Sequence, residues 1–129
     1  MILVDTSIWI ELLNGKLGTK IPPEGLARFV TCGPIVQEVL QGLRETVWAE
    51  PFRHAFLAIP LLSDPLPLGV FLDAAEIYHQ GRRKGYTIRS SGDCLIAAIA
   101  IENRVPVWHR DRDFTLIAKY TGLESFERS

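Results

Sequence analysis

Four acidic residues are scattered along the sequence at points where a strand is predicted to end or a helix to begin. Asp5 follows an apolar run, Glu38 lies in the first turns of a predicted helix, Asp93 enters an apolar helix, and Asp111 follows a short apolar run. In a parallel sheet, strand ends and the starts of the following helices meet at one edge, and ligands bind there. We therefore expect these four side chains to converge in one crevice.

Such a convergence has an electrostatic consequence. Two carboxylates about 4 Å apart repel each other by roughly 4 kcal/mol at an effective dielectric constant near 20. Four of them in one crevice would destabilise the fold or stay partly protonated, and a divalent cation removes that repulsion. Oxygen ligands favour Mg²⁺ or Mn²⁺ over zinc, which prefers His or Cys. The histidines have no metal-ligand spacing and are interpreted as structural or surface residues: His54, His79 and His109.

A hard cation held by carboxylates suits hydrolysis of a phosphodiester bond. The ion can lower the pKa of a bound water, orient that water toward phosphorus and neutralise charge on the leaving oxygen. An acidic crevice without a metal would instead repel a polyanionic substrate. The four acids together therefore predict a metal-dependent enzyme acting on phosphodiester bonds.

Each acid also has an ordinary structural interpretation. Asp5 could cap the helix that follows it, and Glu38 falls on the side of its helix away from the apolar stripe. Asp93 could be stabilised by the dipole of its helix. Asp111 and Asp113 alternate with arginines and could form local ion pairs or cap the last helix. The hypothesis depends on the combination and not on any single residue.

The elements that must position these acids alternate between strands and helices. Strands are predicted over 1–4, after a helical turn within 26–32, and over 105–109. Helical character is predicted over 8–13, 33–43, 48–62, 69–84, 93–103 and 114–120, with 16–25 as a loop and 63–67 as a loop or short strand. This alternation predicts an α/β domain with a mainly parallel sheet.

The apolar segments also indicate the cellular compartment of the protein. Residues 94–101 are apolar all round, so this helix is predicted to be buried. Cys32 and Cys94 lie in apolar stretches, which favours buried free thiols in a reducing compartment, by default the cytoplasm. The run at 1–10 is shorter than a membrane span of ~20 residues, is interrupted by Asp5, and follows no basic segment. We expect neither a signal peptide nor a membrane helix.

The composition predicts one globular domain over residues 1–129. With 47% hydrophobic and 22% charged residues the chain can bury enough surface to fold. A net charge of -1 excludes a globally basic nucleic-acid coat. Setting the four acids aside leaves a small excess of basic residues, which is compatible with attracting a polyanion. The candidate phosphate contacts are Arg82, Arg83, Lys84, Arg89, Arg110 and Arg112.

Four short motifs, in this order, resemble the PIN domain, and in particular the VapC-type toxins of bacterial and archaeal toxin–antitoxin pairs. They are LVDTS at 3–7, EVLQG at 38–42, DCLIAA at 93–98 and HRDRDF at 109–114. The resemblance covers essentially the whole chain. It implies a three-layer α/β/α fold, in which helices flank a small, mainly parallel sheet. It also implies an endoribonuclease that uses Mg²⁺ or Mn²⁺, forms a homodimer and is inhibited by a cognate antitoxin.

The resemblance also assigns roles to individual residues. Asp5 and Asp93 match the principal metal ligands, and Glu38 and Asp111 complete the catalytic acidic set. Ser7 would position a metal-bound water or the substrate. The resemblance reverses the interpretation of Glu38, which the helical pattern alone places in solvent.

This chain departs from the family pattern at three positions. His109 stands where many members have Thr or Ser two residues before the fourth acid. Asp113 is an alternative fourth acid to Asp111, because some relatives lack the earlier one. Gly92 is an unexpected residue before Asp93, although it should leave that carboxylate free to reach a metal.

The sequence leaves two alternatives to a nuclease. A phosphatase of the haloacid dehalogenase type would use Asp5 as a nucleophile, but its usual motif has a second Asp where Ser7 stands. A non-catalytic module could bind RNA or protein through the same edge of the sheet. Well-placed acids indicate a capacity for catalysis and not turnover.

Overall fold

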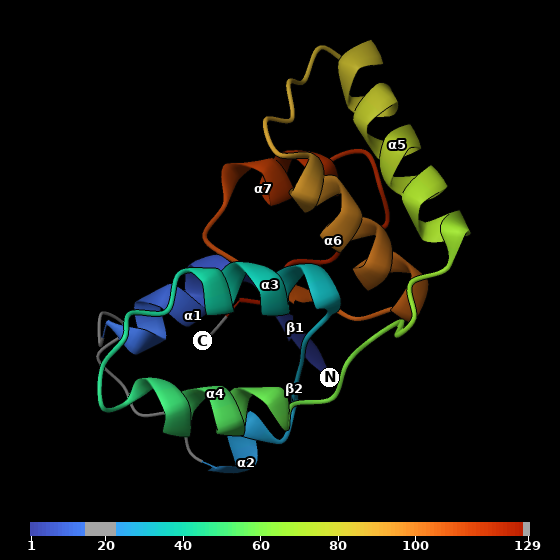
Figure 1. Cartoon of the computed structure of the whole chain (residues 1–129). Coiled ribbons are helices and arrows are strands. Elements are labelled where there is room, and N and C mark those ends of the chain that lie inside the picture. Colours follow the sequence, from blue (N-terminus) through green and yellow to red (C-terminus); the bar gives the residue numbers. More distant parts are fainter. Residues whose placement is uncertain (15–22, 128–129) are drawn as a thin grey trace.

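The computed structural model describes residues 1–14 and 23–127, and the chain alternates between short strands and helices (Figure 1). A three-stranded sheet is surrounded by helices, which agrees with the predicted α/β class. Along the chain the elements are β1 (Ile2–Val4), α1 (Thr6–Leu13), α2 (Pro23–Leu26), β2 (Phe29–Val30), α3 (Gly33–Gln41), α4 (Ala49–Leu57), α5 (Leu68–Arg83), α6 (Ser91–Asn103), β3 (Val107–Trp108) and α7 (Arg112–Ala118).

The sheet is entirely parallel, with the strand order β2-β1-β3. Ile2 pairs with Phe29 on one side of β1, and Val4 pairs with Trp108 on the other. All the strand residues are buried, and they are all apolar because helices cover both faces of a parallel sheet. The strand order places β1 in the centre, so Asp5 leaves the sheet from its middle strand.

Helix α6 runs through the interior beside α5 (Figure 1). It buries seven of its thirteen residues, as predicted from its apolar composition. Helix α5 and the segment that follows α7 approach closely at Gly81, where an added Cβ would lie 2.6 Å from the Tyr120 hydroxyl oxygen. That hydroxyl donates to the carbonyl of Ile77 at 2.8 Å. A larger residue at position 81 would therefore displace the Tyr120 side chain from this hydrogen bond.

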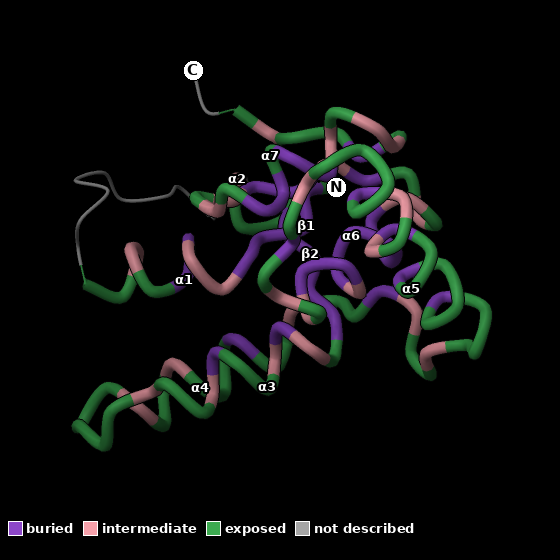
Figure 2. Tube along the Cα trace, turned by 90° about the horizontal axis from the view of Figure 1, so that it is seen from above, coloured by how far each residue is buried: buried purple, intermediate pink, exposed green. Residues whose placement is uncertain are grey.

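Helices α3 and α4 lie side by side and project from the body of the molecule (Figure 2). Trp9 of α1 connects this projection to the sheet, because its ring makes edge contacts with Phe29, Phe52 and Phe56. Its indole nitrogen donates to the carbonyl of Val4 at 3.1 Å. An aromatic cluster therefore fixes α4 relative to the first strand.

Most predicted elements are present, with different ends. Helix α7 begins at Arg112 and not at Phe114, because the side chain of Asp111 caps it. Ser90 caps α6 in the same way, and α6 begins two residues earlier than predicted. Helix α4 covers only Ala49–Leu57 of the helical segment predicted over 48–62.

The predicted loop at 16–25 is wrong over its last three residues, where α2 begins at Pro23. Its first part lies outside the described residues. Residues 63–67 form a loop and not a strand. No helix in the described ranges has both the length and the apolar character needed to cross a membrane.

Candidate metal centre

The first predicted acid, Asp5, ends β1 and caps α1. It is 4% exposed, and its Oδ2 accepts hydrogen bonds from the Ser7 amide at 3.2 Å and the Ser7 hydroxyl at 2.6 Å. The Ser7 hydroxyl oxygen in turn accepts from the backbone amide of Arg110 at 3.1 Å. Asp5 and Ser7 therefore connect the end of β1 to the segment that follows β3. The hydroxyl that the resemblance assigned to water or substrate already donates to Asp5.

Asp93 lies in the first turn of α6 and is 6% exposed. Its backbone amide donates to the hydroxyl oxygen of Ser90 at 3.3 Å. Its carboxylate atom Oδ2 is buried and meets no hydrogen-bond donor in the described part of the chain. Buried polar atoms in proteins are normally satisfied, so an unpaired carboxylate oxygen calls for an explanation such as a proton or an ion.

Asp111 and Asp113 come from the start of α7 and differ in exposure. Asp111 is half-buried, and its Oδ1 accepts from the Asp113 amide at 2.8 Å. Asp113 is 6% exposed, and its Oδ2 accepts from the backbone amides of Arg89 and Ser90 at 3.0 and 3.1 Å. These bonds hold the start of α7 against the segment that enters α6.

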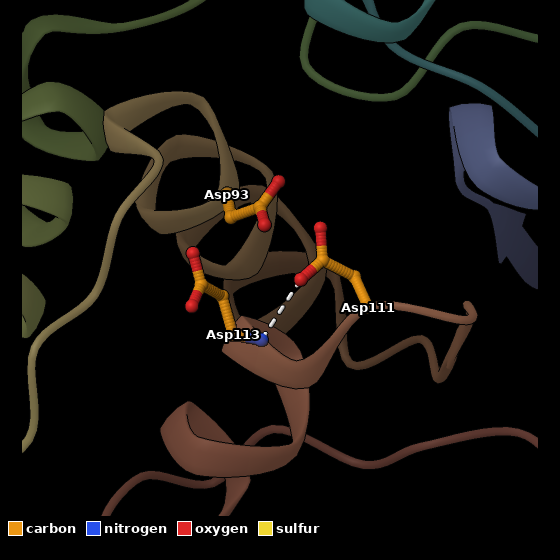
Figure 3. Close-up of side chains that lie close together, drawn as sticks. All are labelled: Asp93, Asp111 and Asp113. Carbon is orange, nitrogen blue, oxygen red and sulfur yellow. Dashed lines mark hydrogen bonds between the residues drawn. The ribbon is translucent and has the colours of Figure 1, made fainter.

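Three of these acids form a compact group, which Figure 3 shows from the side of α7. One carboxylate oxygen each from Asp93, Asp111 and Asp113 lies within 4.8 Å of the others. The Asp93 and Asp111 carboxylates face each other across the space between α6 and α7 (Figure 3). Three carboxylates at this spacing, one of which has a buried oxygen without a donor in the described part of the chain, fit a hard divalent cation.

Glu38 lies outside this three-acid group. It is exposed on α3, and its Oε2 accepts from the Thr6 hydroxyl at 3.0 Å. Its Oε1 reaches the start of α6, because a Cβ added to Gly92 would lie 3.6 Å away from it. The contact with Thr6 spans 32 residues of sequence and has no local signal, so sequence reasoning did not identify it.

The electrostatics of the group centre on Asp93. The pKa of Asp93 is raised from 3.8 to about 9. The largest cause is burial, followed by side-chain hydrogen bonding with Asp111 and by the negative charges of Asp111, Asp5 and Asp113. Near neutral pH, and without an ion, this carboxyl is therefore protonated. A bound cation would lower the pKa of Asp93, since its positive charge compensates the negative charge of the neighbouring carboxylates.

The cysteine and histidine side chains near this centre have other roles. Burial raises the pKa of Cys32 to about 12 and that of Cys94 to about 11, so both stay thiols and not thiolates. Both are free, as predicted. Burial lowers the pKa of His109, whose Nδ1 accepts from the Asp111 amide at 3.2 Å. Its Nε2 then donates to the Ser125 hydroxyl at 2.9 Å, which is a structural role.

The predicted basic residues fall into two groups, and all are exposed. The first is at the C-terminal end of α5, where Arg83 pairs with Glu76 at 2.7 Å. The second borders the acidic group, where the Arg110 guanidinium lies 3.2 Å from Glu11. The first group comprises Arg82, Arg83 and Lys84, and the second Arg89, Arg110 and Arg112.

The chain matches the PIN domain family model over residues 2–120. It is 37% identical to VapC ribonuclease Mb1587 of Mycobacterium bovis and to ribonuclease VapC11 of Mycobacterium tuberculosis, and each alignment covers 97% of both chains.

Solved structures share the fold at lower identity. VapBC-1 from nontypeable Haemophilus influenzae superposes with a TM-score of 0.70 at 15% identity, over 98% of both chains. A toxin–antitoxin complex from Klebsiella pneumoniae gives 0.68 at 19% identity, over 97% of both chains. The family model and the mycobacterial relatives both cover nearly the whole sequence, and this chain therefore belongs to the PIN domain family, in its VapC group.

Proposed function

We propose that this chain is a metal-dependent endoribonuclease that hydrolyses RNA phosphodiester bonds. The observation that carries the proposal is the buried Oδ2 of Asp93, which has no donor among the described residues, in a residue whose carboxylate lies within 4.8 Å of those of Asp111 and Asp113. The mycobacterial relatives of this chain are named VapC ribonucleases. A fold that merely needed an acidic cap would leave this oxygen exposed or hydrogen-bonded.

The catalytic acids in this proposal are Asp5, Glu38, Asp93 and Asp111, with Asp5 and Asp93 as the principal metal ligands. Their support is geometric: Asp5 ends the central strand, Asp93 and Asp111 face each other, and Glu38 reaches the start of α6 beside Gly92. Ser7 holds the Asp5 carboxylate in place through its hydroxyl. Asp113 supports the group from the first turn of α7.

The ion in this proposal is Mg²⁺ or Mn²⁺, because all the available donors are carboxylate oxygens. When bound, such an ion lowers the pKa of a water and neutralises charge at the leaving oxygen. The chain's own contribution is to bury Asp93, to fix Asp5 through Ser7, and to hold Asp111 at the solvent side of the group. In this proposal, an RNA phosphate binds beside these acids.

RNA contacts are assigned to the exposed basic side chains of both groups described above. Arg89, Arg110 and Arg112 directly border the acids in sequence, and their positive charge offsets the repulsion between an acidic site and a phosphate backbone. Arg82, Arg83 and Lys84, at the C-terminal end of α5, are assigned as further RNA contacts in this proposal.

We also propose a cognate antitoxin as protein partner, since the structural neighbours include toxin–antitoxin complexes. A groove of about 460 Å³, lined partly by Ile10, Leu13, Trp48 and Phe52, offers an apolar surface for a segment of such a partner. Trp48 is 75% exposed there, and large exposed apolar patches mark interaction sites.

A homodimer is the proposed oligomeric state. Its support is a second exposed apolar surface at the start of α5, formed by Leu68, Phe71 and Leu72. The buried free thiols Cys32 and Cys94 support a reducing compartment, and we propose the cytoplasm.

The proposal is tested by incubating the purified chain with cellular RNA in Mn²⁺, in excess EDTA, and in EDTA followed by an excess of Mn²⁺. We expect defined RNA fragments in the first and third reactions and intact RNA in the second. Sequencing the new RNA ends then identifies the target. RNA binding that is insensitive to EDTA, without cleavage, would instead identify a non-catalytic module.

A further inference from the structure

Asp113 is buried as deeply as Asp93, but its hydrogen bonding is different. Its Oδ2 accepts from two backbone amides, those of Arg89 at 3.0 Å and Ser90 at 3.1 Å. Hydrogen bonds to a carboxylate are about twice as strong as those between neutral groups. One oxygen of Asp113 therefore has its partners within the protein, whereas Oδ2 of Asp93 has none among the described residues.

The two backbone amides that donate to Asp113 belong to the residues that immediately precede α6. Ser90 is the capping residue of that helix, and its hydroxyl oxygen accepts from the Asp93 amide at 3.3 Å. The contacts run in sequence from the Asp113 carboxylate to the Ser90 backbone, and from the Ser90 side chain to Asp93. Fixing the backbone of residues 89 and 90 thus fixes the first turn of α6.

Asp111 is placed differently, although it is only two residues away. It is half-buried and lies at the solvent side of the group, from which an ion and a phosphate must enter. One of its oxygens caps α7 by accepting from the Asp113 amide at 2.8 Å. Its carboxylate faces that of Asp93 (Figure 3).

We propose that Asp111 is the fourth acid of the metal centre and that Asp113 is a positioning residue, which holds the start of α6 so that Asp93 faces Asp111. This division of roles rests on the proposed metal centre. A ligand acts through its negative charge, whereas a positioning residue acts through its hydrogen-bond acceptors. An asparagine at position 113 keeps an acceptor oxygen for the Arg89 and Ser90 amides and loses only the charge.

The experiment compares the full chain with its Asp113→Asn, Asp113→Ala and Asp111→Asn variants. Mn²⁺ affinity is measured by electron paramagnetic resonance, and hydrogen exchange of the backbone amides of residues 89 and 90 by NMR without metal. For Asp113→Asn we expect unchanged amide protection and an affinity loss of no more than about tenfold. For Asp111→Asn we expect a loss of about a hundredfold or more, because a charged ligand is removed.

The alanine variant tests the positioning itself. Asp113→Ala removes both acceptors, so we expect the amides of residues 89 and 90 to exchange faster and Mn²⁺ affinity to fall by about 10–100-fold. Asparagine at the same position should rescue both. That rescue would support a positioning role.

Three results would overturn the assignment: an Asp113→Asn variant that loses as much affinity as Asp111→Asn, an Asp111→Asn variant that binds Mn²⁺ as well as the unmodified chain, or unaltered amide protection in Asp113→Ala. An unmodified chain that binds no Mn²⁺ would overturn the metal centre and this assignment together. If the chain binds Mn²⁺ but cleaves no RNA, the nuclease proposal fails separately. The order of the variants' affinities still decides the role of Asp113.

Discussion

From Ile96 to Ala100, helix α6 buries apolar side chains, whereas its first turn buries the carboxyl group of Asp93. The apolar part packs beside α5 and α7, and each side chain it removes from water favours folding. The first turn disfavours folding, because it places a carboxyl group with a pKa of about 9 in the interior, and Oδ2 of that group has no donor in the described ranges. The two parts of one helix therefore make contributions of opposite sign to stability.

This difference shows how a small domain can bury an acidic residue. A free carboxylate on the surface would stay hydrated and bind a cation weakly. Here the apolar part of α6 is held in the core, and the helix carries Asp93 inward with it. The unfavourable burial of the acid is thereby maintained by packing elsewhere, and a cation at the site would relieve it.

The largest expected effect comes from removing the charge at the first turn. Replacing Asp93 with Asn should reduce RNA cleavage by about a thousandfold, which corresponds to the roughly 4 kcal/mol interaction of two charges about 4 Å apart. The melting temperature of the metal-free protein should not fall, because the amide is neutral at every pH and the folded protein no longer has to retain a proton at this position. Cleavage is measured on purified protein, with Asp73→Asn on the exposed side of α5 as the control. Undiminished cleavage by Asp93→Asn would refute the site assignment.

The next effect concerns the apolar part of α6. Ile99 is fully buried, so Ile99→Ala should lower the free energy of unfolding by about 2–5 kcal/mol through lost burial and the cavity left behind. Urea denaturation measures this change. Glu102→Ala, on the exposed side of the same helix, should change stability by no more than about 0.5 kcal/mol. Mn²⁺ affinity of the folded Ile99→Ala protein should be unchanged, and a parallel loss of affinity would contradict the separation of the two parts.

A third effect is the linkage between pH, metal and stability. The pKa of Asp93 is raised from 3.8 to about 9 on folding, so the folded protein retains a proton that the unfolded chain releases. The contribution of this group to stability is present below about pH 4 and is lost as pH rises toward 9. Without metal, the melting temperature should therefore fall from pH 5 to pH 9 more steeply than in Asp93→Asn.

Metal should reverse that trend. Mn²⁺ at a hundred times its dissociation constant stabilises the folded state by about 2.7 kcal/mol, and binding strengthens as Asp93 loses its proton. The melting temperature, measured by calorimetry with and without Mn²⁺ at each pH, should show the largest metal-dependent increase at high pH. Identical pH profiles for the unmodified chain and Asp93→Asn would contradict the raised pKa.

Much of this fold could be predicted from local sequence. The apolar residues at 2–4 and the continuous apolar run of α6 indicate a buried strand and a buried helix, because solvent exposure of either would be unfavourable. Element ends were less predictable. Asp111 and Ser90 extend α7 and α6 by two residues through side-chain caps, and a capping residue cannot be distinguished from a loop residue by type alone.

The candidate site shows the same limit. Asp5, Glu38, Asp93 and Asp111 were identified as an acidic set from their positions after strands and at helix starts. The three acids that lie within 4.8 Å of one another include Asp113, however, and not Asp5 or Glu38. Distances of this size depend on how α6 and α7 pack, which sequence spacing does not specify.

The sequence by itself determined which residues are acidic, which segments must be buried, and the order in which strands and helices follow each other. These properties depend on side-chain chemistry and on periodicity within a few residues. Only the tertiary structure decided that Oδ2 of Asp93 has no donor among the described residues while Oδ2 of Asp113 has two. Whether a buried carboxylate is satisfied depends on backbone groups more than twenty residues away, and their positions are set by the packing of the whole domain.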